Sequence, residues 1–189
     1  MTSTPSTPWA RRLLASLDAS DQRATALARP LSVAQLNWRA DQSTWSIGQC
    51  LDHLRAANEV YVPPISAALQ GRGSGPVDEI TPGWFGAWFI RTIIEPSPKT
   101  IKGKAPSKIV PIATVEGTIL DQFVRSNRKT RDLIARAEGF DVNRVRFKNP
   151  FIAVIRFTVG TGLEIITKHE DRHLLQAERI RAHANFPAR

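Results

Sequence analysis

The stretch T161-G-L-E-I-I-T-K-H-E-D-R-H-L-L-Q-A-E-R-I-R-A-H-A184 decides the fold, because most of the chain is predicted to pack around it. Thr161 and Glu164 have the spacing of a capping box, in which a hydroxyl and a carboxylate satisfy the first free amides of a helix. The residues that follow contain no proline and predict about six turns of helix. Apolar residues at helical spacing predict its buried stripe: Leu163, Ile166, Ala177, Ile180 and Ala184.

Two histidines accompany this stripe. His173 falls inside it, and His169 lies at its edge, one turn earlier. At i and i+4 both imidazoles project from one face, which lets a helix offer both to one metal ion. A pair of hydrogen-bonded helix histidines would have the same spacing, so the pattern alone leaves both interpretations open.

The composition is that of one globular domain. A chain of 189 residues, 42% hydrophobic and 23% charged, is large enough to bury a core. Its single cysteine excludes an internal disulfide framework and a cysteine-based zinc finger. No apolar run approaches the ~18 residues of a membrane span. The first twenty residues lack the apolar segment of a signal peptide, so we expect a cytoplasmic protein without a membrane partner.

The net charge of +9 is unevenly distributed. Residues 91–156 contain 14 lysines and arginines against 6 acidic residues, whereas the segments before and after are nearly balanced. This asymmetry indicates either an anionic partner or a solvated basic face.

A first helix is predicted to begin at Thr7-Pro8, a favourable N-cap followed by a proline at the first helical position. Pro30 is expected to end it. The connection that follows carries Trp38 and Trp45, which we expect to close the end of the core.

A second helix is predicted from the capping box of Ser46 and Gln49. Pro63-Pro64 is expected to kink or interrupt this helix near its end. A third helix is predicted for about residues 115–138, where Gly139 provides a C-terminal stop.

A long insertion, residues 71–113, separates the second and third helices. It is predicted to contain a flexible link at 71–83, a short helix at 84–95 that covers the bundle or lines its mouth, and a proline- and lysine-rich loop at 96–111. Ordered connections of this length often serve as lids or contact surfaces. Residues 140–160, which could also form strands, are predicted as a packed loop or a short helix.

Four amphipathic helices with long connections predict an all-α fold, a four-helix bundle with crossover connections. We expect a single domain over residues 7–186, including the insertion, and a disordered tail at residues 1–6.

The chain has four histidines, and three of them lie on or beside core-facing stripes: His53, His169 and His173. Burying three imidazoles is costly unless each has a partner. One divalent ion could bind all three through neutral ring nitrogens and would leave a position for water or substrate. His183, near the end of the last helix, is explained by favourable interaction with the helix C-terminus.

Two motifs, W45-S-I-G-Q-C-L-D-H53-L and G162-L-E-I-I-T-K-H-E-D-R-H-L-L-Q176, resemble the DinB-like superfamily of four-helix bundle proteins. That superfamily includes YfiT-type metal hydrolases and bacillithiol- or mycothiol-dependent transferases and isomerases. The resemblance implies one divalent ion, often zinc or nickel, held by the residues corresponding to His53, His169 and His173.

Three polar residues near the last two histidines are candidates for orienting an imidazole. Gln176 is favoured, because it lies one turn beyond His173 on the histidine side. Glu170 is the second candidate. For Asp171 a position on the solvated surface is the simpler interpretation.

The resemblance implies a divalent-metal-dependent enzyme of the thiol-transferase or hydrolase type. Its partners would be a small-molecule substrate and a low-molecular-weight thiol, and a homodimer is compatible with it. The alternative is a non-enzymatic, metal-stabilised bundle that binds nucleic acid or an acidic partner through its basic surface. Nucleic acid is less favoured, because aromatic residues are not interleaved with the lysines of 96–111 and no nucleic-acid-binding fold is recognised.

Overall fold

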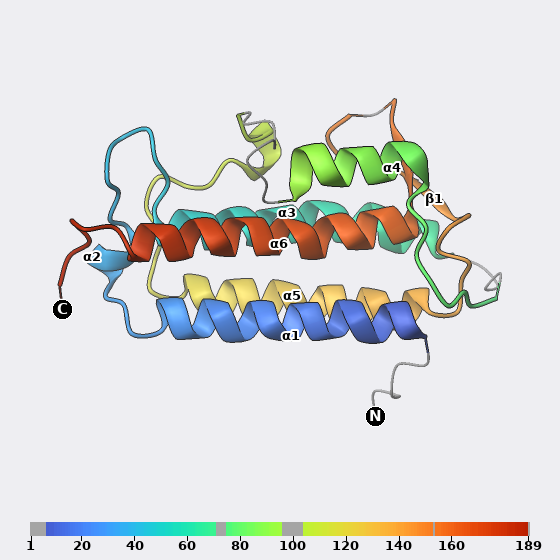
Figure 1. The fold of residues 1–189 in the computed structure, drawn as a ribbon, viewed down its shortest axis with the longest axis horizontal. Coiled ribbons are helices and arrows are strands. Elements are labelled where there is room, and N and C mark those ends of the chain that lie inside the picture. Colours follow the sequence, from blue (N-terminus) through green and yellow to red (C-terminus); the bar gives the residue numbers. More distant parts are fainter. Residues whose placement is uncertain (1–6, 71–74, 96–103, 153, 189) are drawn as a thin grey trace.

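The computed structural model describes residues 7–70, 75–95, 104–152 and 154–188 (Figure 1). The predicted disordered tail at residues 1–6 therefore lies outside the described residues. Within the described part, about half of the residues are in four long helices, and the prediction of an all-α bundle is confirmed. These helices are α1 (Pro8–Ala28), α3 (Ile47–Ala68), α5 (Ile119–Ala137) and α6 (Val159–Arg181).

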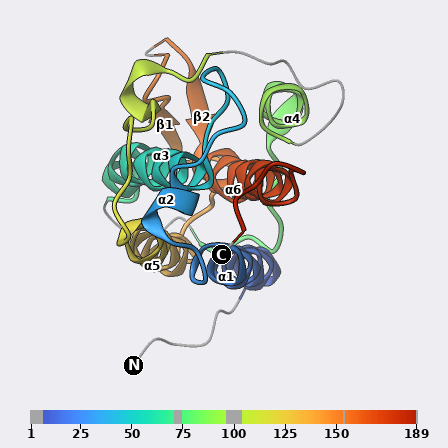
Figure 2. The same ribbon diagram turned by 90° about the vertical axis from the view of Figure 1, so that its left-hand side faces the viewer.

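The four helices form two layers. Helices α3 and α6 lie side by side in one layer, and α1 and α5 lie in the other (Figures 1 and 2). Helices α3 and α5 run in the same direction, as do α1 and α6 (Figure 1). Because parallel neighbours cannot be joined by a tight turn, the connection from α3 to α5 must return along the length of the bundle.

The core is divided into two apolar clusters by a polar layer. One cluster surrounds Trp9 near the start of α1, and the other surrounds Phe123 near the start of α5. Between them each long helix contributes a buried polar side chain: Ser20, Asn58, Asn127 and Glu170. None of the described helices combines the length and the apolar character needed to cross a membrane.

The predicted beginnings of α1 and α3 agree with the structure. Thr7 is the N-cap of α1, although its hydroxyl donates to Glu138 (3.0 Å) instead of capping the helix. At α3 both bonds of the predicted capping box are present. The Gln49 amide N–H donates to the Ser46 hydroxyl, and the Gln49 side chain accepts from the Ser46 amide, each at 3.1 Å.

The predicted start of α6 is wrong by a few residues. Thr158 is the N-cap, and its hydroxyl accepts from the Thr161 amide (3.2 Å). Glu164 does not complete a capping box with Thr161, because its carboxylate pairs with Arg12 of α1. The helix therefore begins at Val159, and it ends at Arg181 rather than at 184.

Pro63-Pro64 is expected to kink or interrupt the second helix, and no interruption is observed. Helix α3 continues through both prolines to Ala68. Tyr61 and Ile65 are buried on either side of the pair, whereas Pro63 is exposed. Packing of the buried residues therefore outweighs the two backbone hydrogen bonds that the prolines cannot donate.

Residues 140–160 contain a β-hairpin where a loop or short helix was predicted. Strand β1 (Arg146–Lys148) pairs antiparallel with β2 (Arg156–Thr158). Phe147 and Phe157 are direct partners and are both buried, while the charged residues that flank them are exposed. The alternation in R-F-K and R-F-T is the period of a half-buried strand.

The insertion places a small third layer over the bundle. Helix α4 (Gly83–Phe89) continues into the π-helix η1 (Ile90–Ile94). Helix α4 lies on the side of the α3–α6 layer that faces away from α1 and α5 (Figures 1 and 2). It therefore covers the bundle, as expected. The 3-10 turn η2 (Ser107–Ile109) follows. Of the loop predicted at 96–111, the part before residue 104 lies outside the described residues.

Gly162 permits the close packing of α6 against the hairpin. A Cβ atom at this position would lie 2.7 Å from the ring of Phe147 and 2.9 Å from Ile65. We expect Gly162→Ala to lower the free energy of unfolding by about 1–3 kcal/mol, because overpacking outweighs the higher helix propensity of alanine. Urea denaturation would measure this. Gly139→Ala is the matched control, since a Cβ there meets nothing within 4 Å, and equal stability of the two variants would contradict the packing argument.

Candidate metal centre

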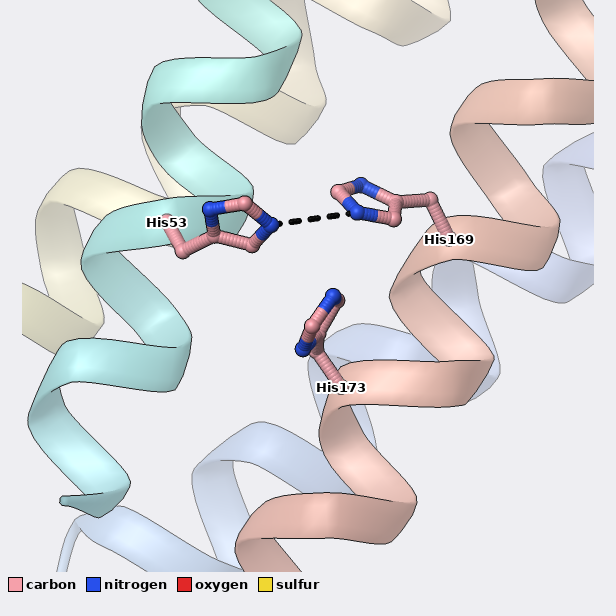
Figure 3. Close-up of side chains that lie close together, drawn as sticks. All are labelled: His53, His169 and His173. Atoms are coloured by element: carbon pink, nitrogen blue, oxygen red, sulfur yellow. Dashed lines mark hydrogen bonds between the residues drawn. The ribbon is translucent and has the colours of Figure 1, made fainter. Parts of the chain in front are cut away.

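The structure brings together the three histidines that the sequence singled out. His53 projects from α3, and His169 and His173 project from α6 toward it (Figure 3). Nε2 of His53 lies 3.1 Å from Nε2 of His169, and one ring nitrogen of each histidine lies within 4.8 Å of the others. A tetrahedral ion with bonds of about 2.0–2.1 Å separates its nitrogen ligands by roughly 3.3 Å. Small side-chain rotations therefore suffice to place all three at bonding distance.

Burial keeps the three imidazoles neutral. His53 and His173 are buried, and His169 is half-buried. Desolvation lowers the pKa of all three rings, well below the usual value for His169 and to about 3 for His173, and the mutual repulsion of their charged forms adds to the effect at His169 and His173. At neutral pH each ring therefore retains a lone pair, as a metal ligand requires.

Two of the rings are oriented by hydrogen bonds on their far side. His53 Nδ1 lies 2.6 Å from the carbonyl oxygen of Ile109, and His173 Nδ1 lies 2.9 Å from the side-chain oxygen of Gln176. Both partners are acceptors, so each Nδ1 carries the proton and each Nε2 is unprotonated. The structure thus places Gln176, the favoured candidate, against a histidine.

An indole covers one side of the histidine group. The ring of Trp45 lies 4.7 Å from that of His53 and is stacked at 5.5 Å on that of His173. The expectation that the tryptophans close the end of the core holds for Trp38, which contacts Phe186. Trp45 also packs against the apolar cluster around Phe123, as expected, and in addition it contacts the imidazoles.

Sequence reasoning missed Asp52, the neighbour of His53. Its carboxylate is buried, accepts from Arg55 at 2.8 and 3.0 Å, and accepts from the main-chain amide of Ile112 at 2.9 Å. The side chain of Gln49 also donates to the carbonyl oxygen of Ile112 (3.0 Å). These bonds fasten the end of the insertion to α3 and so hold the carbonyl that faces His53.

Glu170 and Asp171 do not adjoin the histidines by hydrogen bonds among the described residues. Glu170 is fully buried and accepts from Asn58 (3.1 Å) and Asn127 (3.3 Å), while desolvation raises its pKa to about 8. Glu170 therefore belongs to the polar layer and does not orient an imidazole. Asp171 forms a surface ion pair with Arg23 at 3.1 Å, as its simpler interpretation predicts.

The lone cysteine belongs to the core. Cys50 is completely buried among apolar residues, and burial raises the pKa of its thiol. It therefore remains a protonated core residue at neutral pH.

Comparison with protein families fits these features. The DinB superfamily matches residues 16–177, most of the chain. The chain belongs to this superfamily. No curated protein and no solved structure matches it. A DinB bundle with three converging, neutral imidazoles provides the donor set that suits a divalent transition metal, so a three-histidine metal centre fits the residues present.

The low pKa values of the histidines predict how stability depends on pH. Between the ordinary value of 6.5 and about 3, His173 is protonated in the unfolded chain but not in the folded one. The stability that depends on a neutral His173 is therefore fully present above pH 6.5 and is lost as the pH falls through this range. Without metal, His173→Gln should reduce the loss of stability between pH 6.5 and 4, as measured by urea denaturation at a series of pH values. His183→Gln, at an exposed histidine, is the control, and identical pH profiles for wild type and His173→Gln would contradict the expectation.

Proposed function

We propose that this protein is a divalent-metal-dependent enzyme of the thiol-transferase or hydrolase type, with His53, His169 and His173 as the metal ligands. One observation carries the proposal: ring nitrogens from two helices converge within 4.8 Å of one another. Membership in the DinB superfamily supports it.

The chemistry follows from the number of ligands. Three protein ligands leave a coordination position free, and a divalent ion bound there lowers the pKa of a coordinated water or thiol. Zinc or nickel suits three imidazoles, and the family resemblance adds a low-molecular-weight thiol and a small-molecule substrate as reactants.

The chain's own residues prepare the site for this role. The Ile109 carbonyl and Gln176 hold two rings in the tautomer with an unprotonated Nε2. Trp45 keeps water from one side of the rings. Burial disfavours the protonated imidazoles that would repel a cation.

A second candidate function draws on the basic surface of α5. Arg55, Arg125 and Lys129 line a groove of about 430 Å³ between α3 and α5, and Glu59 is the acidic residue of its lining. Helix α5 also exposes Arg128 nearby. This surface supports the alternative of a metal-stabilised bundle that binds nucleic acid or an acidic partner.

Metal binding is the first test. Protein purified without chelators or a histidine tag should contain about one zinc or nickel ion per chain, and added metal should raise the melting temperature. His169→Ala should reduce the metal content and the metal-induced rise in melting temperature to background. The reason is that two imidazoles from different helices bind a divalent ion far more weakly than three. Elemental analysis and thermal denaturation measure this, with His183→Ala as the control. Full occupancy in His169→Ala would contradict the assigned ligands.

Turnover is the second test and separates the two functions. Metal-loaded protein should catalyse thiol transfer to an electrophile or hydrolysis, and His169→Ala should lower the rate by about 100-fold or more. The alternative function predicts DNA binding that weakens steeply with salt and is indifferent to this substitution. Salt-dependent binding without turnover would therefore replace the enzyme proposal.

A further inference from the structure

Two neighbouring elements on the outer side of the bundle expose large apolar side chains. On α4, Trp84 is 83% exposed, and Trp88 is exposed as well. In the loop between β1 and β2, Val154 is 91% exposed, and Ile152 is also exposed. Figures 1 and 2 show α4 and the hairpin on the side of the α3–α6 layer that faces away from α1 and α5. Single exposed apolar residues are common, but four on adjoining elements indicate a contact surface.

The exposed indoles are not what holds α4 to the protein. The rings of Phe85 and Phe89 lie 5.8 and 5.1 Å from that of Phe157, which is buried in the hairpin. Trp84 and Trp88 each contact the ring of Phe85, with centroids 5.8 Å apart, and remain exposed to solvent. The phenylalanines therefore join α4 to the hairpin, and the tryptophans lie outside the core.

The charged residues of these elements are all basic. Residues 83–94 and 146–158 contain four basic residues and no acidic one. Arg146, Lys148 and Arg156 lie on the exposed face of the hairpin, opposite its two buried phenylalanines. Lys148 and Arg156 are direct cross-strand partners. Like charges in this position destabilise a hairpin, and an anionic partner would remove that cost.

Exposed apolar side chains beside positive charges match an anionic lipid surface better than other partners. Tryptophan is favoured at the membrane–water interface, where aliphatic side chains enter the acyl boundary and basic side chains meet anionic headgroups. A second copy of the chain would bring like charges together. A nucleic acid would satisfy the charges but would leave Ile152 and Val154 without an apolar partner.

We propose that the outer surface of α4 and the β-hairpin docks on a lipid bilayer that contains anionic headgroups. The indole of Trp84 and the side chain of Val154 enter the interface, and Lys148 and Arg156 contact the headgroups. The sequence-based expectation of no membrane partner concerns a spanning segment, and binding to the surface requires none. Docking goes beyond the proposed function, because it uses none of the three histidines.

Vesicle flotation tests the proposal. Full-length protein should float with vesicles of phosphatidylglycerol and phosphatidylcholine in equal amounts, and should stay in solution with phosphatidylcholine alone. Lys148→Gln/Arg156→Gln should weaken binding by roughly 25-fold, because each basic residue near an anionic surface contributes about fivefold. Trp84→Ser should weaken it by about tenfold or more, because the large apolar area of the indole no longer leaves water.

Arg125→Gln/Lys129→Gln is the matched control for charge. It removes the same charge from exposed positions on α5, which lies in the layer away from the proposed surface. Binding should change by less than about twofold, because headgroup attraction falls off within a Debye length. Melting temperatures close to that of wild type would show that the variants are folded.

Four results would overturn the proposal. One is no binding to the anionic vesicles, and another is an equal loss of binding in the α5 control, which would indicate attraction by net charge alone. Undiminished binding of Trp84→Ser would leave an acidic polymer as the partner that fits. A dimer that Trp84→Ser dissociates in sedimentation analysis would assign the surface to a second copy. None of these measurements depends on metal, so each result leaves the proposed function untouched.

Discussion

The structure depends on accommodating three neutral imidazoles at the contact between α3 and α6. Buried polar rings are tolerated only with partners on both nitrogens. For His53 and His173 the outer nitrogen has a protein acceptor, and the inner nitrogens of the group face one another. This requirement is consistent with three features: the position of α6 against α3, the path of the insertion past residue 109 and the placement of Trp45.

His169 and Glu170 are neighbours on α6, but one belongs to the histidine group and the other to the buried polar layer. Glu170 points into the polar layer, where Asn58 and Asn127 donate to it, while His169 points toward His53. About 100° of rotation per residue makes this division possible. Because the buried carboxylate has partners on α3 and α5, rotating α6 about its axis would break those bonds. The polar layer therefore helps to set the orientation in which the histidines converge.

The sequence was sufficient for the features that depend on local periodicity and was insufficient for those that depend on distant partners. The capping box of Ser46 and Gln49 was predicted correctly because both of its bonds are local. The start at Thr161 was wrong because a distant arginine takes the carboxylate that would complete that box. The contact of Trp45 with the imidazoles and the anchoring of Ile112 by Asp52 were missed for the same reason, since each depends on residues far along the chain. The histidines are the exception, because spacing on one helix and a family motif on another restricted the possible contacts. The hairpin was missed although its strands are close in sequence, because two three-residue alternations are a weak signal beside four long amphipathic helices.

The bond between His53 and the Ile109 carbonyl would couple the proposed metal centre to the insertion. The segment after residue 104 is fastened to α3 partly through the same imidazole that would coordinate metal. An N–H on a metal-bound ring is a stronger donor than on a free one, so ion affinity and the docking of this segment must reinforce each other, and to the same extent in both directions. Loss of the ion would therefore weaken the attachment of this segment to α3. Its backbone amides would then be less protected from hydrogen exchange with solvent.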